Sequence, residues 1–374
     1  MTKTLNIGIV ANTAFNIYNF RLGLIKALLQ EGHHVFAIAP ADNYVDLLKE
    51  NNIHFTEVKH LSRKGTNPIN DLKLVNEFRN IYKKNKLDVV LQYTIKPNIY
   101  GTFAAKLTGT KTICTVTGLG YTFLNQGIAS KVAHRLYRFA FSFADKVLFQ
   151  NSDDLQTFIE NHLVDKNKTQ IVPGSGIDTE IFSPNFCITK QDDIIRFLMI
   201  GRLLKDKGVY EYIEAAKNIL QKNKQVEFHL LGEIDNQNPT AIKKEELESW
   251  ITDGIIDYHE HSKDTRPFIC NADCVVLPSY REGMPRVILE GLAMGKPCIT
   301  TDAPGCKDAV IDGESGFICK TADVASLQQI LERFILLDIE YKNRIGINAR
   351  KRAEYTFSMK HITAIYLEIL RKLH

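Results

Sequence analysis

Short hydrophobic runs alternate with longer segments whose hydrophobic residues recur every three or four positions, and this alternation fills most of the chain. A run of four to eight apolar residues is typical of a buried strand, whereas the longer period is typical of an amphipathic helix. In the first half the pattern predicts strands at 5–10, 34–39, 53–58, 88–92, 112–116 and 146–149, and helices at 18–30, 44–50, 69–84, after Pro97 and at 128–143. Strands that alternate with helices favour a parallel sheet covered on both faces.

The same alternation starts again after a segment rich in turn-forming residues at 172–184. The second half is predicted to contain strands at 194–200, 226–231, 255–258, 274–277 and 298–300, with helices between them and at 325–337 and 359–373. A turn-rich segment between two such series favours a domain boundary, which we put at residue 183. We therefore expect domains at 1–183 and 184–345, followed by helices in 346–374 that pack back toward the first domain.

The composition is that of a soluble globular protein, with 44% hydrophobic and 24% charged residues among 374. No run approaches the roughly 18 apolar residues of a spanning helix, so neither secretion nor membrane spanning is expected. The seven cysteines form no C-x-x-C pair, which favours free thiols in a reducing compartment over disulfides or a zinc site. Charge is uneven, because residues 1–183 hold 21 Lys and Arg against 15 Asp and Glu, whereas residues 184–374 hold 26 against 28. The basic first half favours an anionic partner.

One stretch of the second half, 278–291, combines acidic residues with a predicted strand, loop and helix. The loop after the strand at 274–277 carries Glu282, and the helix that begins at Pro285 carries Glu290. In an open parallel sheet, ligands bind beyond the carboxyl ends of the strands, and the N–H groups of residues 283–287 would face an anion there. Either glutamate is also compatible with simple stabilisation of a helix start, although this explains one glutamate better than two.

Two cations follow the first strand of the second half, in the segment Gly201-Arg202-Leu203-Leu204-Lys205-Asp206-Lys207-Gly208. Arg202 and Lys207 are expected at the same sheet edge as Glu282, where fixed cations suit a diphosphate. The alternative is that both are surface charges near a helix start. The βα turns lack G-x-G-x-x-G and the chain lacks a Walker motif, which disfavours a nicotinamide or flavin cofactor and simple NTP hydrolysis. No D-x-D follows an apolar strand, so a metal-dependent transferase with a single sheet is disfavoured.

The motifs of the second half resemble those of glycosyltransferase family 4. The residues that carry this resemblance are Gly201-Arg202 with Lys207-Gly208, Leu231-Gly232, 272–279, Glu282-Gly283 to Glu290, Gly295-Lys296-Pro297, Asp312-Gly313 with Gly316-Phe317, and the preceding Gly176-Ile177-Asp178 and Phe182-Ser183-Pro184. The resemblance implies the GT-B fold, in which two Rossmann-like parallel-sheet domains face a central cleft. It also implies that a sugar is transferred from a nucleotide donor with retention at the anomeric carbon, with no metal and no cofactor, the UDP-sugar being a substrate.

The resemblance assigns roles to residues of the second half. Arg202 and Lys207 would hold the donor diphosphate, Glu290 the ribose and Glu282 the donor sugar, so that Arg202, Lys207 and Glu282 are the expected catalytic residues. The remaining expected donor contacts are Gly201, Gly283, Met284, Pro285 and Val287. Many relatives have a histidine where this chain has Thr117-Gly118, so no histidine base is assigned. Asp308 stands where an acidic residue often follows Pro304-Gly305. The departing diphosphate would then accept the proton of the attacking hydroxyl.

The first half is similar to a narrower group that builds polyprenyl-diphosphate-linked glycans. The similarity lies in the segments 17–21, 93–101 and 115–121, and the acceptor contacts it implies are Asn16, Tyr18, Arg21, Lys96, Asn98, Thr117 and Gly118. The expected reaction transfers a hexose or N-acetylhexosamine, with GalNAc from UDP-GalNAc as the first choice, to a lipid-linked glycan acceptor. A nucleotide-sugar epimerase or hydrolase on the same fold, or a non-catalytic binding subunit, are the alternatives.

A helix predicted at 131–143 has a basic face and an apolar face. Lys131, Arg135 and Arg138 share the first, and Val132, Leu136, Phe139 and Phe143 share the second. Such a helix suits an anionic membrane surface, although a solvated basic face on a domain helix explains the charges as well. The narrower group that the first half resembles works on the cytoplasmic face of the membrane. With this helix, the resemblance implies a cytoplasmic protein, peripheral on the cytoplasmic face of the inner membrane, with no nucleic-acid partner.

Overall fold

The computed structural model describes residues 3–62, 67–119, 128–187, 192–236 and 238–374. The chain forms two compact units: unit 1 comprises Met1–Gly176 and Met359–His374, and unit 2 comprises Ile177–Ser358. These divisions differ from the boundaries that the sequence suggested at residues 183 and 345. The reason lies in the pairing of the ends of unit 2, where the Ile177 amide donates to the carbonyl of Phe357 and Ile177 bridges to Ser358.

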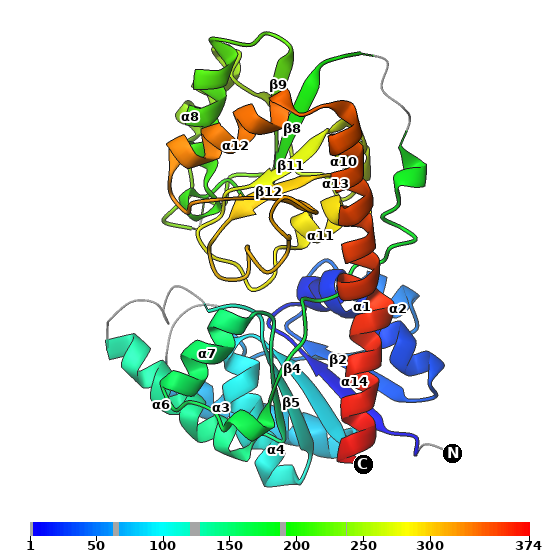
Figure 1. Ribbon diagram of the computed structural model, residues 1–374. Coiled ribbons are helices and arrows are strands. Elements are labelled where there is room, and N and C mark those ends of the chain that lie inside the picture. The colour runs from blue at the N-terminus through cyan, green and yellow to red at the C-terminus, as the bar shows by residue number, and fades with distance from the viewer. Residues whose placement is uncertain (1–2, 63–66, 120–127, 188–191, 237) are drawn as a thin grey trace. The chain divides into compact units, whose positions relative to one another are not determined.

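Unit 1 is built on a parallel sheet (Figure 1). Its strands are β1 (Asn6–Val10), β2 (His34–Ala39), β3 (His54–Glu57), β4 (Val89–Tyr93), β5 (Lys111–Val116), β6 (Lys146–Phe149) and β7 (Thr169–Ile171). Its helices are α1 (Ala14–Gln30), α2 (Val45–Glu50), α3 (Pro68–Lys84), α4 (Thr102–Thr108), α6 (Ile128–Phe143), α7 (Ser152–Glu160) and α14 (Met359–Leu373), with helical turns η1 (Pro97–Gly101) and η2 (Lys166–Lys168). The strand order among the described residues is β3-β2-β1-β4-β5-β6-β7, and each described pairing is parallel.

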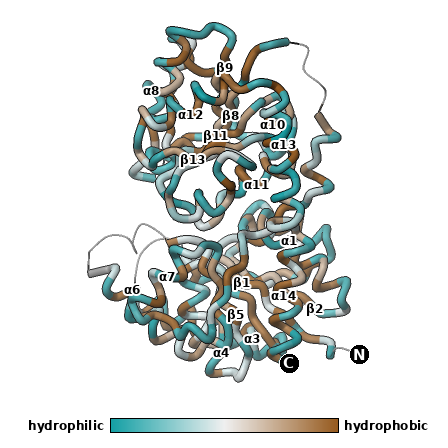
Figure 2. The backbone as a smooth tube through the Cα atoms, in the orientation of Figure 1, coloured by the Kyte–Doolittle hydropathy of each residue, from teal (hydrophilic) through white to brown (hydrophobic). Residues whose placement is uncertain are grey.

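Helices cover both faces of this sheet, as the strand and helix alternation predicts. On one face, Ile7 and Ile9 of β1 pack with Leu24 of α1 and Tyr366 of α14 in a single buried cluster. On the other, α3, α4 and α6 pack beside one another and cover separate clusters of buried residues. Strands of this sheet such as β1 and β5 include hydrophobic stretches of the tube in Figure 2.

Unit 2 repeats the plan on a second parallel sheet. Its strands are β8 (Ile195–Ile200), β9 (Val226–Leu231), β10 (Asp257–His259), β11 (Cys274–Leu277), β12 (Cys298–Thr301) and β13 (Gly316–Cys319). Its helices are α8 (Val209–Leu220), α9 (Lys244–Thr252), α10 (Arg266–Asn271), α11 (Arg286–Ala293), α12 (Val324–Leu336) and α13 (Ile339–Arg352), with turns η3 (Pro184–Phe186), η4 (Lys205–Lys207) and η5 (Ala353–Phe357). The described strands follow the order β10-β9-β8-β11-β12-β13 in parallel pairings.

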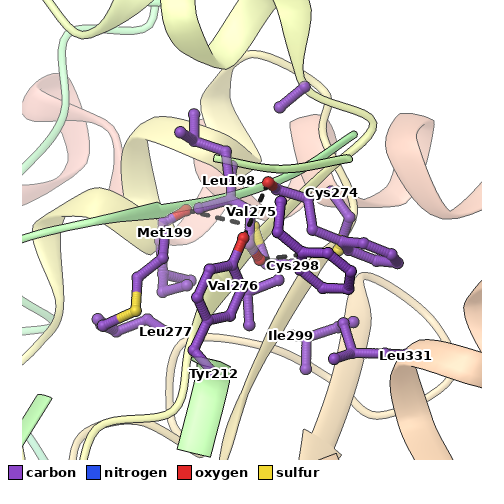
Figure 3. Packing of buried hydrophobic residues seen from close by; sticks show 14 of the residues in the cluster. Leu198, Met199, Tyr212, Cys274, Val275, Val276, Leu277, Cys298, Ile299 and Leu331 are labelled. Carbon is purple, nitrogen blue, oxygen red and sulfur yellow. Dashed lines mark hydrogen bonds between the residues drawn. The ribbon is translucent and has the colours of Figure 1, made fainter. Parts of the chain in front are cut away.

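The core of unit 2 is one continuous cluster in which strands and helices interdigitate. Figure 3 shows part of it, with Leu198 of β8, Val275 of β11 and Ile299 of β12 among the packed side chains. The buried hydroxyl of Tyr212 in α8 donates to the carbonyl of Phe197 at 2.9 Å, so that its polar end is satisfied inside the core. A core of this kind fixes the strand ends from which the functional loops start.

The predicted strands and helices are confirmed with shifts of a few residues at their ends. Helix α1 begins at Ala14 rather than at residue 18, because the Thr13 hydroxyl caps it by accepting from the Asn16 amide at 3.0 Å. The sequence pattern missed helix α7 and the short strands β7 and β13, which lie at or near the ends of the sheets. Among the described residues, no helix has both the length and the apolar character needed to cross a membrane.

The expectation that all cysteines are free thiols was wrong. Cys187 and Cys270 form a disulfide, with their Cα atoms 4.9 Å apart and a sequence separation of 83 residues. The turn η3, which ends just before Cys187, lies against α10, as the contact of the Arg266 guanidinium with the Phe186 ring also shows. No spacing rule anticipates such a pair, and the cysteine content no longer supports a reducing compartment. The other five cysteines are free and buried, as predicted.

Candidate active site

The sheet of unit 2 has a switch point between β8 and β11, where the strand order reverses direction. The chain runs outward from β8 through β9 to β10 on one side, and from β11 through β12 to β13 on the other. Crevices at such points, beyond the carboxyl ends of the strands, are where open α/β sheets bind their ligands. The segments that follow β8 and β11 here are those that carry Lys207 and Glu282.

Lys207 and Glu282 meet directly at this switch point, although 75 residues separate them in sequence. Nζ of Lys207 forms an ion pair with Oε1 of Glu282. Their side chains are 22% and 15% exposed, so water screens the pair only in part. The structure therefore brings together two of the three residues expected to be catalytic. Each side chain neutralises the charge of the other.

Two glycines let the surrounding loops approach closely enough to form this pair. Gly208 has a φ of +78°, and a Cβ atom there would lie 2.1 Å from the carbonyl oxygen of Pro278. Gly305 has a φ of +77°, and a Cβ atom there would lie 2.2 Å from the carbonyl oxygen of Glu282. Any larger residue would push the loops apart. The Glu282 amide also donates to the carbonyl of Pro304 at 3.0 Å, which fixes the loop against the turn after β12.

Tyr280 and Ser279 tie the same loop to the turn η4. The Tyr280 amide and the Ser279 hydroxyl both donate to the carbonyl of Asp206, at 2.9 and 3.1 Å. The Tyr280 hydroxyl donates to Glu211 of α8 at 2.6 Å. Partial burial, together with this bond, raises the pKa of Tyr280, so the phenol remains protonated. The backbone on both sides of the ion pair is thus braced by hydrogen bonds.

Cys306, on the buried side of the Glu282 loop, has no nucleophilic character. Burial and the nearby charge of Glu282 raise the pKa of its thiol to about 12. A protonated thiol is a poor nucleophile. Among the described side chains, the chemistry of this site therefore rests on its charged groups rather than on this sulfur.

Glu290 lies on α11, one turn beyond the helix start, and is 8% exposed. Its Oε1 accepts a hydrogen bond from Nε of Arg286 at 2.9 Å, and its Oε2 accepts one from the Thr265 hydroxyl at 3.0 Å. A buried carboxylate needs such partners. Arg286 could have been predicted as a partner of Glu290, because residues four positions apart lie on the same face of a helix. Nothing in the sequence pointed to Thr265 as the second partner.

Arg202 follows β8 but does not join the pair of Lys207 and Glu282. Its side chain is 51% exposed, and its Nη1 donates to Asp235 in the segment after β9 at 2.9 Å. An exposed pair of this kind contributes little to stability and exchanges partners readily. Arg202 is thus an accessible cation at the edge of the same switch point.

Of the other residues expected at the donor site, Gly201 directly follows β8, where its amide donates to the carbonyl of Leu231 at 3.0 Å, and four lie in the loop and at the start of α11. Gly283 and Pro285 are buried, and Met284 and Val287 are half-buried against the core of the unit. Pro285 stands at the N-cap position of α11, as predicted from its position in the sequence. Asp308 accepts a hydrogen bond from the Gly305 amide at 3.2 Å, which stabilises the turn after β12 that the Glu282 loop contacts.

Unit 1 has its own switch point between β1 and β4, and the expected acceptor residues lie around it. Asn16 and Tyr18 are half-buried on α1, with Tyr18 against the Tyr44 ring at 5.6 Å between centroids. Oδ1 of Asn16 is buried without a hydrogen-bond partner. Arg21, by contrast, is 3% exposed, and its guanidinium lies 3.8 Å from the centroid of the Tyr93 ring. Arg21 therefore belongs to the interior beneath the strand ends.

The segments after β4 and β5 carry the other expected acceptor residues. Nζ of Lys96 pairs with Oδ1 of Asp71 at 3.2 Å, which neutralises its charge. Asn98 is fully buried and donates from its amide to the carbonyl of Thr115 at 3.0 Å. Thr117 and Gly118 are half-buried beyond β5, whereas Tyr121 of the same sequence motif lies outside the described residues.

Thr94 is a residue at this switch point that the sequence did not single out. It follows β4 directly and has a φ of +71°, a conformation that a β-branched residue adopts only under constraint. Its hydroxyl is buried without a hydrogen-bond partner. Strained residues of this type cluster at ligand sites, where the surrounding fold holds them in place.

Comparison with known proteins identifies the family. Residues 186–352 match the model described as Glycosyl transferases group 1, and residues 7–151 match the one described as Glycosyl transferase 4-like. Over 364 residues the chain is 30% identical to the N,N'-diacetylbacillosaminyl-diphospho-undecaprenol alpha-1,3-N-acetylgalactosaminyltransferase of Campylobacter jejuni, with 93% of each chain covered. The chain belongs to the group 1 glycosyltransferases.

Two further proteins resemble this glycosyltransferase. The UDP-Gal:alpha-D-GlcNAc-diphosphoundecaprenol alpha-1,3-galactosyltransferase of Escherichia coli is 28% identical over 312 residues, which cover 78% of this chain and 77% of that one. A glycosyltransferase structure from Rickettsia africae matches with a TM-score of 0.84 at 20% identity, covering 100% of this chain and 99% of the other. The structural likeness confirms the predicted GT-B fold, with its two parallel-sheet domains.

Proposed function

We propose that this glycosyltransferase transfers a hexose or N-acetylhexosamine from a UDP-sugar to a polyprenyl-diphosphate-linked sugar, retains the anomeric configuration and needs no metal ion for transfer. UDP-GalNAc is the first donor to test, because the Campylobacter relative is named as an N-acetylgalactosaminyltransferase. Both that relative and the Escherichia coli one are named for acceptors linked to diphospho-undecaprenol. The names support the reaction type more strongly than they support one sugar.

The ion pair of Lys207 and Glu282 at the switch point carries this proposal. A donor diphosphate that enters there offers Lys207 a second anion, and Arg202 stands at the same edge with its side chain half exposed. As the bond from the sugar to the diphosphate breaks, negative charge grows on the leaving group, and fixed cations stabilise it. Lys207 and Arg202 would together supply the positive charge that a divalent metal ion supplies in other transferases.

Glu282 and Glu290 would hold the two ends of the donor. Glu282 is close enough to Lys207 to stand beside the sugar next to the diphosphate, where its carboxylate opposes positive charge on the anomeric carbon. Glu290 would accept hydrogen bonds from the ribose hydroxyls in exchange for the bond from Thr265. The attacking hydroxyl would pass its proton to the departing diphosphate, so that the new bond forms on the face that the leaving group vacates.

Unit 1 would bind the acceptor and the membrane surface. The unpartnered oxygen of Asn16 and the half-buried Tyr18 suit sugar hydroxyls. On α6, Val132 and Phe139 are 43% and 60% exposed beside the exposed Lys131 and Arg135. Apolar and basic side chains together suit an anionic lipid surface. We infer a peripheral enzyme on the cytoplasmic face of the membrane that holds its lipid-linked acceptor.

A direct test incubates the purified chain with UDP-GalNAc, UDP-GlcNAc, UDP-Glc or UDP-Gal and a polyprenyl-diphosphate-linked sugar. Extension of the lipid by one sugar, with an axial anomeric bond by NMR and unchanged rates after removal of Mg²⁺ and Mn²⁺, is the expected result. Sugar conversion or UDP release without an acceptor would instead indicate an epimerase or a hydrolase. Binding of UDP-sugars without turnover in the presence of every acceptor would contradict the proposal.

A further inference from the structure

Two histidines and an aspartate converge on one face of the sheet of unit 2, at its β10 edge. His229 lies on β9, and Asp257 and His259 lie two residues apart on β10. The register pairs Asp257 with His229 and His259 with Leu231. Side chains two residues apart on a strand point to the same face, so the three polar groups meet above neighbouring strands. None of them belongs to the donor site described above.

The three side chains present one donor atom each, at separations typical of ligands on a single ion. Nδ1 of His229 lies 3.2 Å from Nε2 of His259, and Oδ2 of Asp257 lies 3.3 and 3.6 Å from these two nitrogens. Ligand atoms about 2.0–2.1 Å from a tetrahedral zinc ion stand about 3.3–3.4 Å from one another. The observed triangle has nearly this size, and the fourth corner is left for water or a further ligand.

The surroundings orient the first of these ligands. Nε2 of His229, the nitrogen that faces away from the triangle, lies 3.2 Å from Oε2 of Glu227. Glu227 in turn accepts a hydrogen bond from Nε of Arg196 at 2.7 Å. Metal-binding histidines usually have such a carboxylate on their second nitrogen, because it fixes the tautomer and raises the basicity of the ligating atom. Phe268 of α10 packs against the ring of His259 at 5.0 Å between centroids.

The three side chains differ in solvent exposure, so an ion bound between them would be shielded by the protein on one side and open to solvent on the other. The side chains of His229, His259 and Asp257 are 11%, 30% and 61% exposed. We propose that His229, Asp257 and His259 form a binding site for one divalent transition-metal ion of the zinc type. Imidazole nitrogens favour such ions over Mg²⁺ and Ca²⁺, which prefer oxygen ligands.

The site has a route to the donor site through the chain itself. His259 ends β10, and six residues later Thr265 donates to Glu290 at 3.0 Å. A bound ion would hold the end of β10 and thereby restrict the segment that brings Thr265 to Glu290. We expect the ion to stabilise unit 2 and to steady Glu290, without contact with the reacting groups. This consequence rests on the proposed function, whereas binding of the ion does not.

The binding test uses the full chain after treatment with a chelator. Addition of Co²⁺ is expected to give the visible absorption of a tetrahedral complex at one equivalent, and Zn²⁺ is expected to abolish it by displacement. His229→Gln and His259→Gln are each expected to remove the one-equivalent signal. His261→Gln is the matched control, because this exposed histidine follows β10 two residues beyond His259 and lies outside the triangle. Absence of one-equivalent binding in the wild type, or equal binding in His259→Gln, would refute the site.

Two further variants separate ion binding from loss of structure. Asp257→Asn changes an exposed side chain and is expected to weaken Co²⁺ binding while leaving the unfolding temperature of the ion-free protein unchanged. Glu227→Gln is expected to lower affinity by about 10–100-fold, the usual effect of removing a carboxylate behind a ligand. Zn²⁺ should raise the unfolding temperature of the wild type but not that of His259→Gln. Identical Zn²⁺ effects in all variants would overturn the assignment.

Chelation also distinguishes this proposal from the proposed reaction. If removal of the ion raises the donor KM in the wild type and leaves it unchanged in His259→Gln, the site acts through Glu290 as proposed. If chelation abolishes transfer in both proteins, the proposal of a metal-independent reaction is wrong. The proposed binding site would still be supported by the one-equivalent Co²⁺ absorption.

Discussion

The two units share a strand order around their switch points but differ in the groups that stand at the strand ends. In unit 2 these groups are charged and held in ion pairs at or near the surface, namely Lys207 with Glu282, Arg202 with Asp235 and Arg286 with Glu290. In unit 1 the corresponding positions hold neutral groups such as Asn16 and Tyr18 together with one ion pair, Lys96 with Asp71, while Arg21 and Asn98 have become part of the interior. The same architecture therefore carries mainly charged groups at the strand ends of unit 2 and mainly neutral hydrogen-bonding groups at those of unit 1.

This difference matches the two substrates of the proposed reaction. A nucleotide diphosphate is small and strongly charged, so a few ion pairs ready to exchange partners suffice to bind it. A sugar on a lipid carrier offers neutral hydroxyls to the protein and leaves its charge near the membrane surface. The comparison predicts that charge removal in unit 2 affects catalysis, whereas changes in unit 1 affect the acceptor and the membrane.

Lys207→Ala is expected to have the largest effect. Loss of a positioned cation at a leaving group lowers kcat/KM by at least about 100-fold. Steady-state transfer from UDP-sugar to the lipid-linked acceptor measures this value. Lys205→Ala is the matched control, because Lys205 is an exposed lysine in the same turn η4. Equal turnover in Lys207→Ala and wild type would remove Lys207 from the mechanism.

Charge reversal on α6 comes next and concerns membranes rather than turnover. Lys131→Glu with Arg135→Glu removes two exposed cations, each contributing about 1 kcal/mol near an anionic surface, so binding to anionic vesicles should fall by at least about 30-fold. Arg138 is left intact, because it donates to the carbonyls of Asn161 and His162 after α7 and a change there would disturb the fold.

Vesicle sedimentation over a range of salt concentrations measures this effect. Neutral vesicles and a soluble acceptor analogue serve as controls. The variant and the wild type should sediment equally with neutral vesicles and should transfer sugar to the soluble analogue at equal rates. Salt-independent sedimentation, or equal sedimentation of the two proteins, would mean that this helix face is merely solvated.

Glu290→Ala is expected to raise the donor KM by about 10-fold with little change in kcat. A contact to the ribose contributes equally in the ground state and the transition state, so its loss appears in binding alone. Thr265→Val, which removes the hydroxyl that donates to Glu290, should produce a smaller change in the same direction. A fall in kcat at unchanged KM would instead connect Glu290 with the chemical step.

Asn16→Ala should have the smallest effect and the opposite selectivity. The loss of one hydrogen-bonding group to a neutral sugar is expected to raise the acceptor KM by about 5-fold while the donor KM stays constant. Isothermal titration with UDP and kinetics with varied acceptor distinguish the two constants. An increase in the donor KM alone would mean that Asn16 contacts the nucleotide sugar rather than the acceptor.

The fold was predictable because its signal is local. Hydrophobic periodicity locates the strands, and alternation with helices implies parallel sheets whose carboxyl ends meet, which is how Lys207 and Glu282 were expected at one edge. The burial of Arg21 was also available in the sequence, since it falls on the same helical face as Ile17, Leu24 and Leu28.

The partners of the charged groups were not predictable, because the fold decides them over long distances. Arg202 pairs with Asp235, Thr265 reaches Glu290, and Cys187 finds Cys270 across 83 residues. Each pairing depends on how loops pack, and loop packing produces no periodic pattern of hydrophobic residues in the sequence. The positive φ of Thr94 could not be predicted from the sequence either, since only the surrounding structure forces this conformation on a threonine.

The interruption of unit 1 by unit 2 has a consequence for biosynthesis. Ile362, Tyr366, Ile369 and Leu370 of α14 complete a buried cluster of unit 1, yet they follow all of unit 2 in the chain. Domains usually fold as units while the ribosome delivers them, the amino-terminal one first. The first 176 residues are therefore made before α14 exists to cover this apolar cluster, whereas all of unit 2 is made before α14 and can complete its own core first. A newly made chain is therefore most exposed to chaperones and aggregation in its amino-terminal unit.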